Sequence, residues 1–173
     1  MKTKKIFVGL VLNLAVYNVD AQIGIAKETV NGMSTILDFK DTSSNTKGLI
    51  IPSVDSAPST LTNEDNGTFI FDKSDSIIKI YENNIWKNLS DVGNSSSVFA
   101  NISLETGTKV IIGNPTSNAK GVLILESPDK AMILPLIGNP HINVKKPYPG
   151  MICYDTVSKS LSVFDGLVWS YWK

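Results

Sequence analysis

The chain contains an internal repeat in which two stretches of sequence match at a spacing of 83 residues. Residues 47–52 read Lys-Gly-Leu-Ile-Ile-Pro, and residues 130–135 read Lys-Ala-Met-Ile-Leu-Pro. The same spacing, without a gap, aligns three further pairs: Gly67 with Gly150, Asp72 with Asp155, and Trp86 with Trp169. A fixed period of this kind indicates one supersecondary unit built twice. The sequence therefore predicts two similar folded units.

The repeat also sets the expected domain boundaries. The first unit is predicted to span residues 22–90 and the second residues 107–173. Residues 91–106 lie between them and begin with a run rich in Gly, Asn and Ser, which is typical of a flexible linker. Residues 98–104 are apolar enough to predict one additional strand inside this connecting segment.

Within each unit the apolar residues alternate with polar ones. Ile78 and Ile80 flank Lys79, and Leu161 and Val163 flank Ser162 at the matching place. This period of two predicts strands with one buried face. Two tight turns are expected to close the hairpins, one at residues 83–84 (Asn-Asn) and one at residues 165–166 (Asp-Gly), since these residues tolerate positive φ.

Helical patterns are weak. Residues 27–37 form the best candidate helix, and Gly32 weakens it. The predicted fold class is therefore all-β, with two similar short β-meander units joined by a Gly/Asn/Ser linker and little helix after residue 21.

The N-terminus has the three-part layout of a secretory signal peptide. Lys2, Lys4 and Lys5 precede an apolar run at residues 6–16, and small residues at 19 and 21 mark a cleavage site before Gln22. The apolar run is too short to span a bilayer, which takes about 20 residues. We expect residues 1–21 to be removed and the protein to be secreted, to the cell surface or the medium, with the periplasm as an alternative.

Charge and composition exclude several kinds of partner. Removing residues 1–21 leaves 13 lysines against 15 acidic residues, and arginine is absent from the chain. Arginine is the side chain best suited to bidentate phosphate recognition. A slightly acidic chain without it is a poor nucleic-acid binder, so no nucleic-acid partner is expected. No further apolar stretch predicts a transmembrane segment.

The sequence contains no credible active site, and the protein is not expected to be an enzyme. His141 is the only histidine and stands in a stretch without metal-ligand spacing, so a solvated loop position is expected. Asp72 and Asp75 lack the glycine and distal glutamate of a calcium loop, and capping of a turn explains them. No catalytic residue, cofactor or metal site is predicted.

The tryptophans are the only candidate ligand contacts. Trp86, Trp169 and Trp172 could stack on sugar rings. Packing on the hairpin core is the alternative for the repeated pair, and Trp172 aligns with Leu89, which favours an apolar contact. Cys153 is the only cysteine; it aligns with Ile70 in an apolar strand, so a buried thiol is expected.

Three short sequences have the form aspartate, hydroxyl residue, small or aliphatic residue. They resemble an O-glycosylation signal of exported proteins in some Gram-negative bacteria, with Ser56, Ser76 and Thr156 as the candidate acceptors. Three ordinary turns are the alternative interpretation.

Several of these stretches together resemble a repeat module of secreted Gram-negative surface proteins, found in tail-fibre-like and adhesin-like chains. The matching sequences are residues 47–52, residues 66–72 (Asn-Gly-Thr-Phe-Ile-Phe-Asp), residues 80–89 (Ile-Tyr-Glu-Asn-Asn-Ile-Trp-Lys-Asn-Leu) and the start at residues 22–25. The resemblance implies a structural or adhesive protein of the cell exterior. It also implies self-association, because fibre-like relatives wind three chains together; a homotrimer is therefore expected, with a monomer as the alternative. A glycan or surface partner is the remaining expectation, and a carbohydrate-binding module using Trp86 and Trp169 is the alternative function.

Overall fold

The computed structural model describes residues 22–99, 107 and 109–173. Within these ranges the chain is almost entirely β, as the alternating pattern predicts. The only helical turns described are η1 (Asn63–Asp65) and α1 (Pro140–Asn143). The strands, in chain order, are β1 (Ile23–Ile25), β2 (Thr35–Phe39), β3 (Leu49–Ile50), β4 (Ser53–Val54), β5 (Phe69–Asp72), β6 (Ile77–Glu82), β7 (Ile85–Asn88), β8 (Val110–Ile112), β9 (Leu123–Leu125), β10 (Ala131–Met132), β11 (Leu136–Ile137), β12 (Met151–Asp155), β13 (Ser160–Phe164) and β14 (Trp169–Trp172).

Two of the sheets have the same topology. One has the order β4-β5-β6-β7 and the other the order β11-β12-β13-β14. In both, the first pair is parallel and the other two are antiparallel. Tyr81 pairs with Trp86 in the first sheet, and Phe164 pairs with Trp169 in the second, again 83 residues apart. The repeat in the sequence is thus a repeat of strand order and register.

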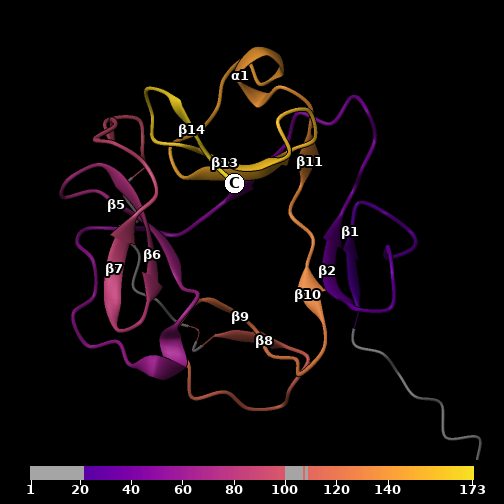
Figure 1. Cartoon of the computed structure of the whole chain (residues 1–173). Helices are drawn as coiled ribbons and strands as arrows, with labels where there is room; N and C mark the ends of the chain where they lie inside the picture. The colour runs from indigo at the N-terminus through magenta and orange to yellow at the C-terminus, as the bar shows by residue number, and fades with distance from the viewer. Residues whose placement is uncertain (1–21, 100–106, 108) are drawn as a thin grey trace, which may run out of the picture.

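Parallel pairs form the remaining sheets. The first has the order β1-β2-β10, and the second contains only β8 and β9. Figure 1 shows the four sheets arranged around the middle of the molecule, with β4–β7 on the left, β11–β14 at the top, β1-β2-β10 on the right and β8-β9 at the bottom.

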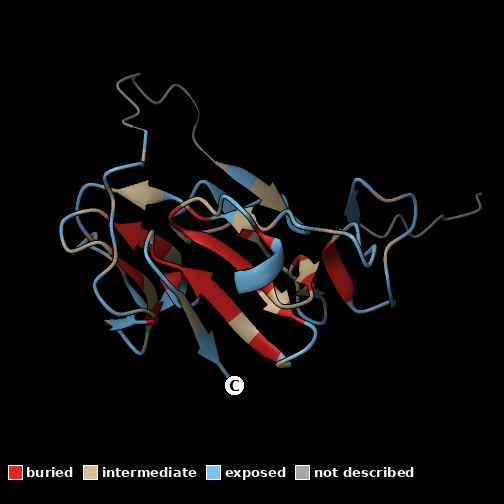
Figure 2. Ribbon diagram, turned by 90° about the horizontal axis from the view of Figure 1, so that it is seen from above, coloured by how far each residue is buried: buried red, intermediate tan, exposed pale blue. Residues whose placement is uncertain are grey.

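Strands cross between the two halves of the chain. β3, from the first half, pairs antiparallel with β12, and β10, from the second half, pairs parallel with β2. The main core is shared in the same way. It contains Ile51, Phe71, Ile78, Leu89, Ile152 and Val163, drawn from both halves. Figure 2 shows buried residues along the strands in the middle of the molecule and exposed residues in the outer loops. The unit boundaries at residues 22–90, 91–106 and 107–173 stay a prediction.

Residues 27–37, the best of the weak helix candidates in the sequence, are not helical, in line with the little helix expected after residue 21. This segment forms bends and turns, and β2 begins at Thr35. Asp38 is buried, and its Oδ2 accepts hydrogen bonds from Lys27 Nζ at 2.6 Å and from the Asn31 amide at 2.8 Å. Local side-chain bonding of this kind competes with a helix for the backbone. Gly32, at φ +77°, also takes a conformation outside the helical region.

The hairpin turns follow the prediction in one unit and shift by one residue in the other. Asn83 and Asn84, at φ 53° and 63°, form the two-residue turn between β6 and β7. In the second hairpin the Asp165 amide donates to the carbonyl oxygen of Val168 at 3.3 Å. The turn residues are therefore Gly166 and Leu167, and Asp165 Oδ1 accepts the Leu167 amide at 2.8 Å.

The strand expected at residues 98–104 is not found where the structure describes it. Val98 and Phe99 lie in a bend and an irregular stretch, and residues 100–106 fall outside the described residues. Phe99 is 86% exposed and stacks on Tyr148 with ring centroids 6.3 Å apart. Residues 1–21, the predicted signal peptide, also lie outside the described residues. In the part of the chain that is described, no helix has the length and apolarity needed to cross a membrane.

Candidate functional site

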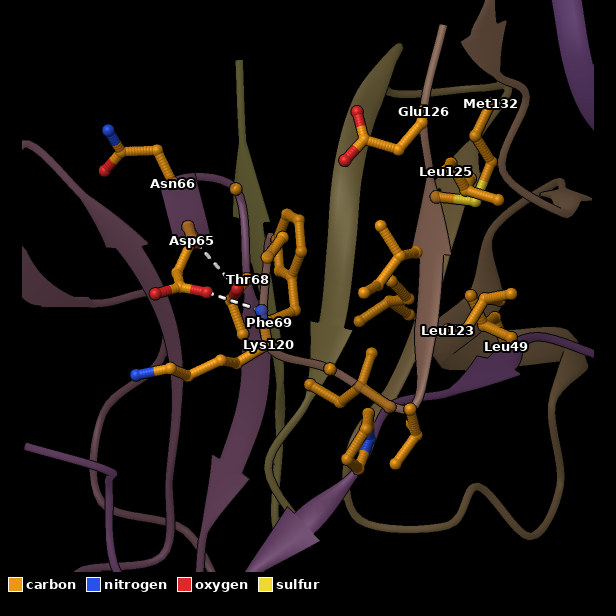
Figure 3. A pocket seen from close by; sticks show the side chains of 18 of the residues that line it. Leu49, Asp65, Asn66, Thr68, Phe69, Lys120, Leu123, Leu125, Glu126 and Met132 are labelled. Atoms are coloured by element: carbon orange, nitrogen blue, oxygen red, sulfur yellow. Dashed lines mark hydrogen bonds between the residues drawn. The ribbon is translucent and has the colours of Figure 1, made fainter. Parts of the chain in front are cut away.

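A cavity of about 750 Å³ lies where the four sheets meet. Its walls come from each sheet: Leu49 of β3, Phe69 of β5, Leu123 and Leu125 of β9, and Met132 of β10 (Figure 3). The lining is mainly apolar, with Asp65, Lys120 and Glu126 at its margin. Residues far apart in the sequence therefore form one apolar surface.

Asp65 joins the two halves of the chain at the rim of this cavity. Its buried carboxylate accepts hydrogen bonds from the Thr62 amide at 2.8 Å and from the Lys120 amide at 2.6 Å. Lys120 Nζ also donates to the carbonyl oxygen of Thr60 at 2.7 Å. Burial by itself would raise the pKa of Asp65, but the Thr62 and Lys120 amides outweigh it and hold this pKa below its ordinary value. The charged carboxylate is thus the form that holds the segment leading into β9 against η1.

Asp65 and Lys120 line this cavity, and the sequence patterns did not single them out. Neither lies in the repeated stretches used to align the units. Only the fold brings a backbone amide from residue 120 to a carboxylate 55 residues earlier.

The three candidate tryptophans contact different neighbours. The Trp86 indole packs edge-to-face on Tyr81 at 5.2 Å, and its Nε1 donates to the carbonyl oxygen of Pro58 at 2.9 Å. Trp169 packs on Phe164 at 5.4 Å. Among the described ring contacts none joins two indoles. The structure therefore places the repeated pair in equivalent packing positions and does not gather the three into one platform.

Trp172 lies in a different setting, at the edge of a polar groove. The groove has a volume of about 460 Å³ and is lined by the end of β7, the residues after it and β14: Asn88, Leu89, Ser90, Asp91, Ser170, Tyr171 and Trp172. Trp172 is 47% exposed, and its Nε1 donates to the Leu89 carbonyl oxygen at 2.5 Å. About half of this side chain is therefore exposed beside polar side chains.

Asp72 and Asp155 cap turns, as the sequence indicated. Asp72 Oδ1 accepts the Ser74 amide at 3.0 Å, and Asp155 Oδ1 accepts the Val157 amide at 2.9 Å. Asp72 is buried and also binds Lys79 Nζ at 2.7 Å. Within the described residues, no three His, Cys, Asp or Glu side chains come together in a way that could hold a metal ion.

The candidate glycosylation residues all lie in bends or turns. Ser56 and Thr156 are exposed. Ser76 is half-buried, has φ 59°, and its hydroxyl donates to Ser95 Oγ at 3.0 Å. Ser56 and Thr156 therefore present free surface around the hydroxyl, and Ser76 presents less.

His141 and Cys153 complete the residues singled out from the sequence. His141 lies on α1, is exposed, and bonds through Nδ1 with the Tyr171 hydroxyl at 2.9 Å. Cys153 is fully buried, as its alignment with Ile70 predicts. Burial, with a smaller contribution from the Asp155 charge, raises the pKa of the Cys153 thiol to about 12.

A family model for a phage tail like trimerisation region matches residues 24–104. The match runs from β1 through β7 and includes the first of the two equivalent sheets. No curated protein and no solved structure matches the chain. Over residues 24–104 the chain is therefore similar to a phage tail-like trimerisation region, which agrees with the tail-fibre-like resemblance of its sequence.

Proposed function

We propose that this chain is an exported structural subunit that assembles with two further copies of itself and performs no catalysis. The similarity of residues 24–104 to a phage tail-like trimerisation region is the observation that carries the proposal. The apolar cavity walls and sheet edges are consistent with it, because exposed apolar patches commonly mark contacts between chains.

Several exposed apolar side chains lie on the short parallel sheets. Ile23 and Ile25 of β1 are 40% and 45% exposed, and Val110 of β8 is 58% exposed. A short sheet with one uncovered edge tends to pair with another chain. These side chains supply apolar area of the kind an assembly buries.

Light scattering on the protein from Gln22 onward tests the assembly. We expect a mass close to three times that of one chain at micromolar concentration. A mass close to that of one chain would refute the trimer.

Export is the second part of the proposal. It is supported by the basic, apolar and small-residue segments of residues 1–21. Mass spectrometry of the protein from its native cells should show an N-terminus at Gln22, and fractionation should place it at the surface or in the medium. A product that keeps Met1 would contradict export.

Carbohydrate binding is a second candidate function. The polar groove beside Trp172 favours it, because a half-exposed indole next to amide, carboxylate and hydroxyl groups suits a sugar ring. Trp172→Ala should abolish any glycan-array signal, whereas Trp86→Ala, whose Nε1 is bonded to Pro58, should keep it. If only Trp86→Ala lost the glycan-array signal, the binding site would lie at Trp86 instead. If the parent protein gave no signal, carbohydrate binding would be ruled out.

A further inference from the structure

The repeat reveals a sheet edge that is filled in the second unit and open in the first. The outer edge of β12 carries two strands. β11 pairs at Tyr154 and Asp155, and β3 pairs at Met151 and Ile152. The matching edge of β5 carries β4 at Phe71 and Asp72. Within the described residues no strand pairs with the other half of this edge, at Thr68 and Phe69.

The open half of the β5 edge already has the backbone conformation of its filled counterpart. Gly67 and Gly150 have φ +90° and +84°. Each donates its amide to the neighbouring hairpin strand, to Tyr81 and to Phe164, at 2.8 Å. The Gly150 carbonyl oxygen accepts the Ile51 amide at 3.0 Å. The Gly67 carbonyl oxygen therefore points toward the open edge of β5, just as the Gly150 carbonyl oxygen points toward the strand segment that contains Ile51.

The same edge presents the backbone groups of Phe69. The Phe71 amide donates outward to the Pro52 carbonyl oxygen at 2.9 Å. Backbone groups point to the same side of a strand at every second residue. The N–H and C=O of Phe69 therefore face the open edge, as those of Ile152 face β3.

A complementary open edge lies on β10. Residue 132 corresponds to Leu49, which pairs with Ile152. The amides of Ala131 and Ile133 donate to Ser34 and Leu37, on the β2 side, at 2.8 and 2.9 Å. By the same alternation, the N–H and C=O of Met132 point away from β2. β10 thus exposes the backbone groups that its counterpart β3 uses to bind β12.

In one chain these two edges do not meet. In Figure 3, Thr68 and Phe69 lie on one side of the cavity and Met132 lies on the other. β10 is also held by β2 along its other edge. A second copy can bring the same β10 edge to β5 without breaking either sheet.

We propose that β10 of a second copy pairs antiparallel with the open half of β5, with Met132 of that copy opposite Phe69 and Ile133 opposite Thr68. The proposed register is the one in which β3 pairs with β12, transferred to the equivalent residues 83 positions away in each strand. The inference rests on the proposed self-association and names the strand edges that meet in it. The pairing extends the β5 sheet across the chain boundary and covers the half-buried side chains of Phe69 and Met132.

Cysteine cross-linking tests the pairing. Thr68→Cys is placed in one tagged copy and Ile133→Cys in a second, differently tagged copy, and the two are co-expressed. Antiparallel residues that do not exchange hydrogen bonds lie about 4.5 Å apart at Cα, which is within the range for a disulfide. We expect a disulfide between the two tags in the mixture and none in either variant alone. Buried Cys153 will not compete.

The matched control is Ile50→Cys with Met151→Cys in one chain, the counterpart pair that the structure already places in register. If this control forms within a chain and the trimer persists without a Thr68–Ile133 disulfide, the proposed pairing is wrong and the proposed function stands. A disulfide confined to single chains carrying both Thr68→Cys and Ile133→Cys would show that β10 closes on its own β5. A monomeric mass would refute the assembly itself.

Discussion

Trp172 donates a hydrogen bond from Nε1 to the carbonyl oxygen of Leu89 at 2.5 Å, and the two residues occupy equivalent positions 83 residues apart. The end of the second sheet is therefore fastened to the end of the first. A second contact reinforces it, since the Asn94 amide donates to the Asp165 carbonyl oxygen at 2.8 Å. The two sheets are thus joined both through a shared core and through the segment that follows β7.

Gly93→Ala should destabilise the joint between the sheets. A Cβ at Gly93 would lie 2.1 Å from the Asp165 carbonyl oxygen, and backbone cannot move aside cheaply. We expect a loss of about 1–3 kcal/mol in the free energy of unfolding, the usual cost of overpacking. Gly107→Ala, where no atom of the described residues lies within 4 Å of the added Cβ, is the control and should change little. Equal denaturant midpoints for the two variants would contradict this prediction.

Lys79→Ala should be far more costly than Lys87→Ala. Lys79 pairs with buried Asp72 at 2.7 Å, and its own side chain is only 11% exposed. Removing one partner of a buried pair leaves an uncompensated charge and costs about 3–5 kcal/mol. Lys87 pairs with Glu82 on the surface, where about 1 kcal/mol or less is expected. Urea unfolding of both variants measures the difference, and similar losses would argue against a structural role for the buried pair.

Acid should destabilise the fold through its capping aspartates. Burial alone would raise the pKa values of Asp65, Asp72 and Asp155, but the hydrogen bonds they accept lower each below 3.8. Carboxyls with lowered folded pKa values stabilise the fold above the unfolded value, and this stability is lost as pH falls through the folded value. The free energy of unfolding should therefore fall from about pH 4 downward, and Asp65→Asn should reduce the slope. A flat profile between pH 5 and pH 2 would contradict this.

Cys153 should not react in the native protein. Its burial and its pKa of about 12 keep the thiol protonated and covered at pH 8. Iodoacetamide should label it only after denaturant is added, at a rate that follows unfolding. Ser56→Cys, at an exposed bend, is a suitable positive control and should react at once. Rapid labelling of native Cys153 would show that the β12 core opens.

The sequence by itself determined the class of fold, the two equivalent hairpins and the buried thiol. Each depends on local or periodic information. Alternation around Lys79 and Ser162 identifies strands with one buried face, and the Asn83-Asn84 pair selects a turn with positive φ because its side chains tolerate that conformation. The repeat spacing then places the second hairpin in step with the first, as the Tyr81–Trp86 and Phe164–Trp169 pairs show.

The tertiary structure decided the rest, because the remaining contacts join residues that no local pattern connects. β3 leaves its own half of the chain for β12, and β10 pairs with β2. The segment before Leu37 bends because buried Asp38 binds Lys27 and the Asn31 amide. The cavity exists only once four sheets have met, because both halves of the chain supply residues to its lining.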